Sequence, residues 1–351
     1  MSGGVDSSVA ALLLKEQGLD VIGATLSLFS EDDIVRAQEN ERDFCAFSGI
    51  EDARRVAEKL GIEHVVIDLR ESFRKNVMSR FAESYLRGET PNPCIYCNRT
   101  IKFGEMLERA QELGCDYIAT GHYAVNSFDE RSGRWLLSRP SDRHKEQTYV
   151  LYTLTQEQLS HTLFPLGTLD KSRVRELAGS AGLINSKKPD SQDICFVPDG
   201  KYAEFIKKFT GADIRSGSFI STDGRVLGEH RGIINYTVGQ RKGLGISLGK
   251  PAYVVSKDAA ANTVILGGEA DLYTRSLTAY DVNLISVEKL DAPMRITAKT
   301  RYSQNETPAL LTKLENGEYR VDFDEPQRAV TSGQSAVFYD GDIVVGGGTI
   351  R

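Results

Sequence analysis

The chain has 351 residues and a formal net charge of −6, with 40% hydrophobic and 26% charged residues. This length predicts two or three domains, and the composition is typical of a globular protein in water. No apolar run approaches the roughly 20 residues of a membrane span, and no secretory signal is recognisable. We therefore expect a cytoplasmic protein without a membrane partner. The acidic charge argues against a non-specific nucleic-acid binder, although basic pairs such as Arg241-Lys242 can form a local basic face.

The most informative segment is the start of the chain, Ser-Gly-Gly-Val-Asp-Ser-Ser at residues 2–8. Two glycines let the backbone turn tightly and approach a ligand, and residues 9–17 predict a helix capped by Ser7 or Ser8. Free N–H groups at such a helix start attract an anion. The segment lacks the lysine of the common P-loop and resembles the pyrophosphate loop of enzymes that split ATP into AMP and pyrophosphate. The alternative is a Gly-Ser turn that only caps a helix.

Only Met1 precedes this loop. Doubly wound α/β domains place such a loop after a buried parallel strand. We therefore expect either that the start was assigned too late, or that roughly five to eight residues of a truncated first strand are missing.

Strand and helix signals then alternate over the first 200 or so residues. Strands are predicted at 21–28, 64–68 and 116–120, and helices at 50–60, 71–86, 98–113, 154–161 and 171–181. A capping box, Ser48-x-x-Glu51, is expected to open the helix at 50–60. The prolines at 91 and 93 predict a loop at 90–93. Strands that alternate with helices predict a parallel sheet.

After about residue 210, short strands joined by glycine-rich turns replace the helical periodicity. Residues 253–257 and 263–266 are expected to pair, and Asn316-Gly317 and Asp340-Gly341 each predict a hairpin, the first with a type I′ turn. Two small β barrels or sandwiches fit this pattern. We expect an α/β ATP-pyrophosphatase-type catalytic domain at 1–208, a central β-barrel domain at 209–276 and a C-terminal β-barrel domain at 277–351.

Five cysteines, an odd number, argue against a disulfide scaffold and for reduced thiols. Cys94 and Cys97 form a Cys-x-x-Cys pair just after the 90–93 loop, and Cys195 lies in a polar segment at 190–196. The pair alone fits a redox couple, half a metal site or an accident, and without a second pair a structural zinc is not expected. Its place before a helix start favours a thiolate. Cys45 and Cys115 are expected to be small core residues.

Several motifs in order resemble the tRNA-specific 2-thiouridylase family over essentially the whole chain. These are the segments at 2–8, 90–103, 119–123, 145–147, 190–196, 239–245, 299–302 and 332–339. The resemblance implies an adenine nucleotide hydrolase-like first domain. It also implies a substrate and cofactor: tRNA with a wobble uridine, for Lys, Glu and Gln, and ATP with Mg²⁺.

The resemblance also implies a mechanism. ATP adenylates the oxygen at C2 of the uridine, and the loop at 2–8 holds the pyrophosphate. Cys195 carries a persulfide sulfur, delivered by a sulfur-relay protein or a cysteine desulfurase, and this sulfur attacks C2. Cys97 then attacks the persulfide and releases 2-thiouridine, which leaves a Cys97–Cys195 disulfide.

Binding roles are implied position by position. ATP contacts are expected from Met1, Ser2, Gly3, Gly4, Val5, Asp6, Ser7, Leu26 and Gly121. The target base is expected to face Asn92, Pro93 and Cys94. Contacts to tRNA are expected from His122, Lys145, Glu146, Gln147, Arg301, Tyr302 and Gln334. The alternatives for Tyr302 and Gln334 are barrel residues, and for His122 a loop histidine with satisfied hydrogen bonds.

Cys94 departs from the family pattern, since many members have Asp there. Three thiols, Cys94, Cys97 and Cys195, could instead hold a [4Fe–4S] cluster whose open iron binds sulfide. Two rival functions are another ATP-to-AMP ligase with the same loop and a non-enzymatic RNA-binding protein. The ligase explains neither Cys195 nor the β domains, and the RNA-binding protein leaves the pyrophosphate loop without a role.

Overall fold

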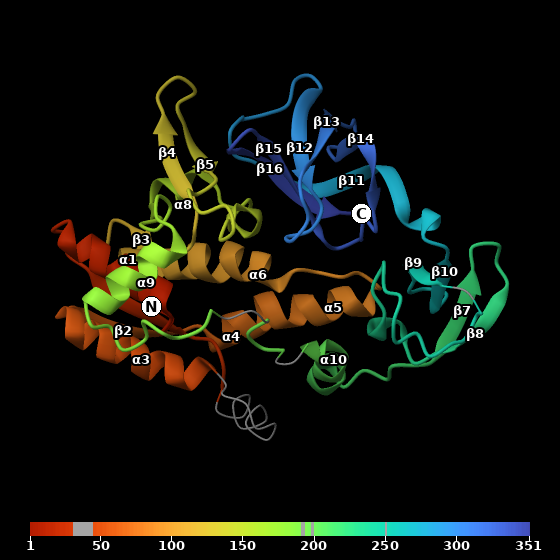
Figure 1. The fold of residues 1–351 in the computed structure, drawn as a ribbon, viewed down its shortest axis with the longest axis horizontal. Helices are drawn as coiled ribbons and strands as arrows, with labels where there is room; N and C mark the ends of the chain where they lie inside the picture. Colours follow the sequence, from red (N-terminus) through yellow and green to blue (C-terminus); the bar gives the residue numbers. More distant parts are fainter. Residues whose placement is uncertain (31–44, 191–193, 198–199, 250) are drawn as a thin grey trace.

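The computed structural model describes residues 1–30, 45–190, 194–197, 200–249 and 251–351, without the side chains of 45–48. Figure 1 shows three parts: an α/β part with the N-terminus, a small β domain at the opposite end, and a C-terminal β barrel beside them. In the described residues, no helix is long and apolar enough to cross a membrane.

The first part contains two parallel strand pairs among helices. Strand β1 (Ile22–Ser27) pairs with β2 (Glu63–Asp68), and β3 (Ile118–Ala119) pairs with β6 (Thr162–Leu163). Parallel pairing is confirmed, but the described strands form two separate pairs rather than one sheet. The helices are α1 (Val5–Glu16), α3 (Cys45–Leu60), α4 (Arg70–Phe73), η1 (Arg74–Ser79), α5 (Arg80–Leu86), α6 (Pro93–Tyr96), η2 (Cys97–Glu105), α7 (Met106–Glu112), η3 (Thr148–Val150), α8 (Gln156–Ser160) and α9 (Lys171–Ser180).

Two predicted helix starts were wrong. Helix α1 begins at Val5 with Gly4 as its N-cap and no side-chain cap, so Ser7 and Ser8 lie inside its first turns. Helix α3 already includes residue 48, which therefore cannot be its N-cap. Both serines in α1 bond to Gly4 instead: their hydroxyls donate to its carbonyl oxygen at 3.1 and 3.0 Å. The tight glycine turn, rather than a hydroxyl cap, starts this helix.

The helix that carries the Cys-x-x-Cys pair begins within the predicted loop. Pro93 occupies its first turn, where a missing N–H costs nothing, and the Asn92 side chain accepts from the Cys94 N–H at 3.1 Å. The helix then continues from α6 through η2 and α7 to Glu112, with π-type turns in η2. Cys94 and Cys97 therefore lie in the first two turns of one continuous helix.

Helix α10 and the β4–β5 hairpin were not predicted from the sequence. Helix α10 (Tyr202–Thr210) crosses the predicted limit at residue 208. The hairpin of β4 (Val125–Asp129) and β5 (Arg134–Ser138) belongs to the first part in sequence, yet β5 pairs with the last strand, Ser138 facing Ile343. The domain limits at 208/209 and 276/277 stay predictions.

The β part follows the predicted pattern. The middle domain has the strand order β8 (Val226–His230), β7 (Gly217–Ser221), β10 (Thr263–Gly267), β9 (Tyr253–Asp258), and includes η5 (Ile233–Asn235) and η6 (Ala270–Leu272). The C-terminal strands are β11 (Tyr273–Leu284), β12 (Met294–Lys299), β13 (Thr307–Lys313), β14 (Tyr319–Arg328), β15 (Ser335–Asp340) and β16 (Ile343–Ile350). Pairing of β11 with β16 closes these strands into a barrel.

Both predicted hairpins form, but the type I′ turn was wrong. A type I′ turn needs positive φ at both central residues, and at 316–317 only Gly317 has it, at +82°. The Leu314 N–H donates to the Glu318 carbonyl oxygen at 2.8 Å, so three residues form the loop. A three-residue loop with glycine in the left-handed region is the next most common hairpin connection.

Candidate functional site

Close backbone contacts shape the loop at residues 2–8. Gly3 has φ +71°, and a Cβ there would lie 2.5 Å from the Gly49 carbonyl oxygen, so only glycine fits. The Ser7 hydroxyl lies 3.2 Å from the Ser2 hydroxyl and accepts from the Ser2 N–H at 3.1 Å. Because no side chain caps α1, the loop offers both hydroxyls and its first-turn N–H groups to an anion.

Gly121, just after β3, packs directly on this loop. A Cβ at Gly121 would lie 2.7 Å from the Ser7 backbone nitrogen, so the two segments are in backbone contact. Met1 is joined to β1, where the Thr25 hydroxyl donates to its carbonyl oxygen at 2.7 Å. Leu26 lies near the end of the same strand, half-buried against the hydrophobic core. Gly121 thus lies directly against the loop, whereas Leu26 packs in a different hydrophobic cluster from Val5 of the loop, and the role of all these residues with ATP stays a prediction.

Asp6 of the loop is held by two residues that the sequence did not single out. The Lys171 ammonium lies 2.7 Å from both oxygens of the Asp6 carboxylate, and the Tyr123 hydroxyl donates to one of them at 2.9 Å. Lys171 is buried at the start of α9 and also lies 2.7 Å from the Asp190 carboxylate. One buried lysine therefore joins the loop to the start of the 190–196 segment.

Asp190 receives two further cations. Lys145 lies 2.8 Å away and Arg175 3.2 Å away. Burial alone would raise the pKa of Asp190, but hydrogen bonds from Lys145 and Lys171 outweigh it and hold that pKa below its usual range. Lys145, predicted to contact tRNA, is thus bound to the segment that carries Cys195. In the sequence, Asp190 could be recognised by its place in the 190–196 motif. The only sequence signal for Lys171 was its position at the start of a predicted helix.

Cys94, Cys97 and Cys195 come together although about 100 residues separate the pair from the third thiol. All three are free thiols; Cys97 is buried, while Cys94 and Cys195 keep contact with solvent. Burial raises the pKa of the Cys195 thiol, and the nearby Cys97 and Cys94 raise it further. Burial also raises the pKa of Cys97, to about 11. Cys195 is therefore reached by solvent, although the surrounding protein raises its pKa.

Lys102 is the cation of this thiol cluster. It lies five residues after Cys97 in η2, and its charge opposes the burial effect by lowering the pKa of all three thiols. Lys102 belongs to the 90–103 motif, but the sequence predicted no role for it. A nearby positive charge is what favours a thiolate over a thiol.

The predicted metal alternative finds no support. Within the described ranges, no group of three or more His, Cys, Asp or Glu side chains is arranged to hold a metal ion. The three thiols approach one another closely enough to interact electrostatically, but not as a ligand set.

Glu146 and Tyr302 connect the C-terminal barrel to the site. The largely buried Glu146 carboxylate lies 3.0 Å from the Lys299 ammonium, and the Tyr302 hydroxyl donates to the Glu146 carbonyl oxygen at 3.1 Å. Tyr302 is 45% exposed, and Cys94 is one of the charges that raise the pKa of its phenol, after burial and Glu146. Tyr302 is therefore exposed to solvent and near enough to Cys94 for the two groups to interact electrostatically.

The other predicted tRNA contacts are bound within the protein. His122 is buried beside Phe103, bonds to the Thr120 hydroxyl at 2.9 Å, and has its pKa lowered well below the usual value by burial and Lys102. The Gln147 side chain accepts from the Tyr123 N–H at 2.9 Å. These contacts position the site, and direct contact of His122 or Gln147 with tRNA stays a prediction.

Arg301 and Gln334 connect domains. One Arg301 nitrogen donates to the carbonyl oxygens of Val238 and Ala329, at 3.2 and 2.7 Å. The Gln334 amide donates to the Thr90 carbonyl oxygen at 2.6 Å and so holds the segment that leads to Asn92, Pro93 and Cys94. The barrel therefore helps to place the region expected to face the target base.

Comparison with known proteins gives consistent matches along the chain. Residues 1–199 match the tRNA methyl transferase HUP domain, 203–268 the tRNA methyl transferase PRC-barrel domain, and 274–350 the aminomethyltransferase beta-barrel domain. Over all 351 residues the chain is 55% identical to the tRNA-specific 2-thiouridylase MnmA of Acetivibrio thermocellus and 52% identical to that of Clostridioides difficile, covering 98% and 96% of those proteins. The MnmA 1 protein of a Thermoanaerobacter species is 54% identical, with 96% covered.

Proposed function

The chain belongs to the tRNA-specific 2-thiouridylase family, and we propose that it converts the wobble uridine of tRNA to 2-thiouridine through Cys97 and Cys195. It is an enzyme that uses ATP and acts on tRNA. The observation that carries the residue assignment is the meeting of these two thiols beside the loop–Asp190 ion network.

The first half of the reaction is adenylation. The oxygen at C2 of uridine is a poor leaving group, and attack on the α-phosphate of ATP converts it to an AMP ester with release of pyrophosphate. Ser2, Ser7 and the first turn of α1 are suited to hold that pyrophosphate. Mg²⁺ arrives with the nucleotide; Asp6 is the one carboxylate of the 2–8 loop, and Lys171 already binds both of its oxygens.

The second half is sulfur transfer. The terminal sulfur of a Cys195 persulfide bonds to C2, and AMP leaves with its electron pair. The Cys97 thiolate then attacks the Cys195 sulfur, the S–S bond breaks, and its electron pair forms the thiocarbonyl of 2-thiouridine. The product is a Cys97–Cys195 disulfide, which an external thiol reductant must reduce. We propose a sulfur-relay protein or cysteine desulfurase as donor, and the tRNAs for Lys, Glu and Gln as substrates in the cytoplasm.

Replacing each thiol separates the two halves. We expect Cys97→Ser and Cys195→Ser to abolish thiolation, measured by mass analysis of the tRNA, while tRNA-dependent pyrophosphate release persists. Cys115→Ser is the matched control, since Cys115 is half-buried outside this cluster, and it should retain activity. Thiolation at the normal rate by Cys195→Ser would contradict the mechanism. Pyrophosphate release that needs a small acid instead of tRNA would indicate a ligase. If no pyrophosphate is released at all, the chain would be a non-enzymatic RNA-binding protein.

Iron content decides between the persulfide route and a cluster. We expect protein purified without oxygen to be fully active when free of iron, and Cys94→Asp to keep activity because Asp is the commoner residue of the family there. A cluster predicts a brown protein with about four iron and four sulfide per chain. Activity strictly proportional to iron would overturn the persulfide route.

A further inference from the structure

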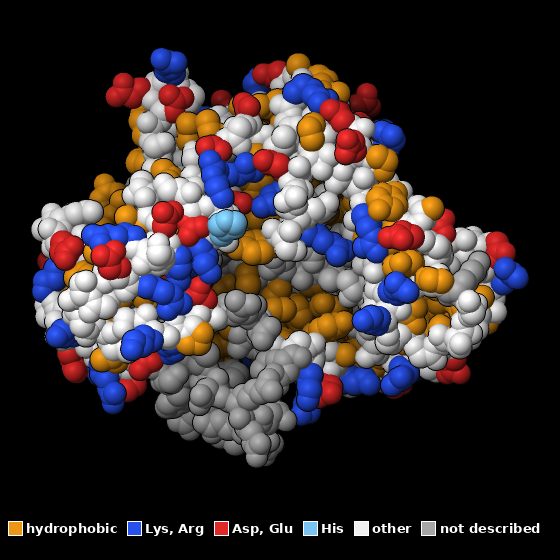
Figure 2. Space-filling model, viewed as in Figure 1, with side chains coloured by type: hydrophobic (Ala, Val, Ile, Leu, Met, Phe, Trp, Pro, Cys, Tyr) orange, Lys and Arg blue, Asp and Glu red, His pale blue; other side chains and the backbone are white. Residues whose placement is uncertain are grey.

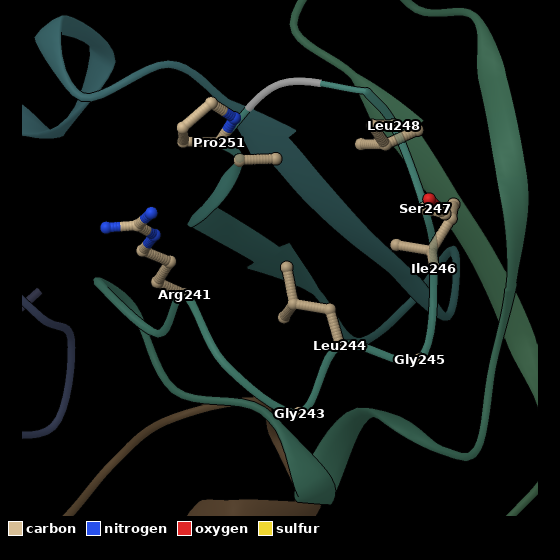
Figure 3. Close-up of a pocket in the computed structure, with 9 residues that line it drawn as sticks. Arg241, Gly243, Leu244, Gly245, Ile246, Ser247, Leu248 and Pro251 are labelled. Atoms are coloured by element: carbon tan, nitrogen blue, oxygen red, sulfur yellow. The ribbon is translucent and has the colours of Figure 1, made fainter.

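Lys102 is a cation that has no role in the reaction of Cys97 and Cys195 as proposed. It lies in η2 between the buried residues Ile101 and Phe103, and its own side chain is half-buried. A hollow of about 430 Å³ in the middle domain (Figure 3) is lined by residues between 241 and 252, and by no thiol. The place of the reaction is therefore found from the charged and reactive groups rather than from this hollow.

The winding of η2 places Lys102 on the same side of the helix as Cys97. In an α-helix, residues five apart project about 140° from each other, because each residue turns the chain by about 100°. In a π-helix the backbone hydrogen bond joins residue i to residue i+5, so residues five apart lie nearly one above the other. Cys97 and Lys102 are five residues apart, and both lie within the π-helical span Cys97–Glu105. The π-type turns thus direct the ammonium along the face that carries the thiol.

The same part of η2 also approaches the loop at residues 2–8. The Phe103 ring packs on the His122 ring with 5.8 Å between the ring centres. His122 directly follows Gly121, where a Cβ would lie 2.7 Å from the Ser7 backbone nitrogen. Burial and then the charge of Lys102 lower the pKa of His122, which agrees with this closeness. Lys102 therefore lies at the boundary between the thiols and the segment that contacts the loop.

Lys102 has no partner of its own within the protein. Among the residues that the structure describes, its ammonium forms no ion pair and donates no hydrogen bond. Other lysines with little exposure are paired, since Lys171 lies 2.7 Å from Asp190 and Lys299 lies 3.0 Å from Glu146. A half-buried cation without a counter-charge has lost water and gained nothing in return, so it is suited to bind an anion.

We propose that Lys102 is a catalytic residue that binds the α-phosphate of ATP and stays on that phosphate until AMP leaves. The inference rests on the proposed function and deepens it. The α-phosphate is bonded to the pyrophosphate before adenylation and to the uridine oxygen after it, so it must lie between the 2–8 loop and Cys195. Figure 2 shows that this face is hollowed between the α/β part and the β domains, in the region where Figure 1 draws α6, which leaves room for the substrate.

The charge of Lys102 suits both steps of the reaction. In adenylation, the uridine oxygen at C2 bonds to the α-phosphorus, the bond to the β-phosphate oxygen breaks with its electron pair, and the N3 proton of uridine passes to solvent. In sulfur transfer, the bond from C2 to the phosphate oxygen breaks, and AMP takes the electron pair. Negative charge grows on the oxygens around the α-phosphorus in both steps, so an ammonium that donates to a non-bridging oxygen stabilises both transition states. Lys102 keeps its proton throughout.

The test measures tRNA-dependent pyrophosphate release in the Cys195→Ser background, which carries no persulfide and so reports adenylation alone. At saturating ATP and tRNA, K102M should lower the rate constant of release about 10²–10³-fold, with unchanged affinity for tRNA and unchanged melting temperature. K102R should recover part of this loss, because it keeps the positive charge. K75M, which changes an exposed lysine of η1, is the matched control and should release pyrophosphate at the rate of its parent.

A second measurement separates contact with the α-phosphate from a structural role. In α-thio-ATP, sulfur replaces one of the two non-bridging α-oxygens, which gives two diastereomers. The loss caused by K102M should be smaller with the diastereomer that lacks the oxygen bound by the ammonium, because both changes then remove the same contact. Equal losses with ATP and with both diastereomers would indicate a merely structural lysine and would overturn the proposal.

The outcomes distinguish this inference from the proposed function. Release by K102M at the rate of the Cys195→Ser parent would overturn the role of Lys102 and leave the proposed function standing. Wild-type protein that releases pyrophosphate through Lys102 in the expected way, but never forms 2-thiouridine, would support the inference and defeat the proposed function.

Discussion

At the scale of single residues, burial favours the protonated form of the Cys97 and Cys195 thiols. Desolvation disfavours the charged form of a buried group, and it raises the pKa of Cys97 to about 11 and of Cys195 further still. Lys102 works against this effect. A thiol that stays protonated near neutral pH is less exposed to oxidation, because oxidation follows thiolate character.

The pH dependence of alkylation tests this. We expect iodoacetamide to react slowly with Cys97 at pH 7, and the rate to keep rising until the pH passes about 11, because a raised pKa keeps the thiol protonated up to that point. Lys102→Met should slow alkylation of both thiols at pH 9, since it removes the charge that lowers their pKa. Lys75→Met, an exposed lysine of η1, is the control. A midpoint below pH 9 in the wild type would contradict the role of burial.

At the scale of elements, the site depends on where turns and helix starts bring backbones together. The loop before α1 and the turn after β3 each approach within contact distance of another segment, and a glycine stands at each approach. Gly121 is the clearest case, because it contacts Ser7 of the 2–8 loop, which we propose to hold the pyrophosphate.

Gly121→Ala should displace this loop. Its new Cβ would meet backbone atoms at 2.7 Å, which cannot swing aside. We expect a loss of about 1–3 kcal/mol in stability and at least about tenfold weaker ATP binding, which corresponds to about 1.4 kcal/mol, measured by thermal melting and nucleotide titration. Gly179→Ala is the control: it lies in α9 with nothing within 4 Å, and should be stabilising by about 0.5–1 kcal/mol. Unchanged ATP affinity in Gly121→Ala would remove the turn from the nucleotide site.

At the scale of the whole molecule, the first and last parts of the chain share one sheet. The β4–β5 hairpin continues the C-terminal strands through β16. Arg139, directly after β5, donates to Glu306 at 2.9 Å and lies 4.1 Å from the centre of the Tyr339 ring. The barrel that carries Tyr302 and Gln334 is therefore attached to the catalytic part at a second place, away from the chain connection.

Arg139→Met should loosen this attachment. The arginine side chain is 11% exposed and its partner 33%, so we expect a loss of about 2–3 kcal/mol, toward the low end for a buried pair because the carboxylate is partly hydrated. Melting temperature and hydrogen exchange in β5 measure it. Arg143→Met breaks the exposed pair with Asp342 and should change little. Equal effects of the two variants would show that the buried pair does not hold the parts together.

The sequence by itself determined the family and the three-part fold, because local signals are strong there, whereas the roles of Cys97 and Cys195 stay a proposal. Alternating apolar runs with glycine turns predict strands and hairpins wherever they occur. The polar motifs that contain Cys94, Cys97 and Cys195 can likewise be recognised from the sequence alone. The pyrophosphate loop is equally local, since its shape comes from consecutive residues. Even so, its helix cap was assigned to Ser7 or Ser8, because the sequence does not reveal that the turn at Gly4 starts the helix.

Tertiary structure alone decided which distant residues meet. Lys171, at the start of α9, binds both Asp6 of the 2–8 loop and Asp190, and no local pattern encodes that pairing. By sequence position, strands β4 and β5 belong to the first domain, but β5 pairs with β16 of the C-terminal barrel. Arg301 shows the same limit, because no local pattern reveals that it is bound to carbonyl oxygens at a domain junction and lies beside Arg328; its contact with tRNA stays a prediction. Burial and long-range charge depend on the whole packed chain, so they appear only once it has folded.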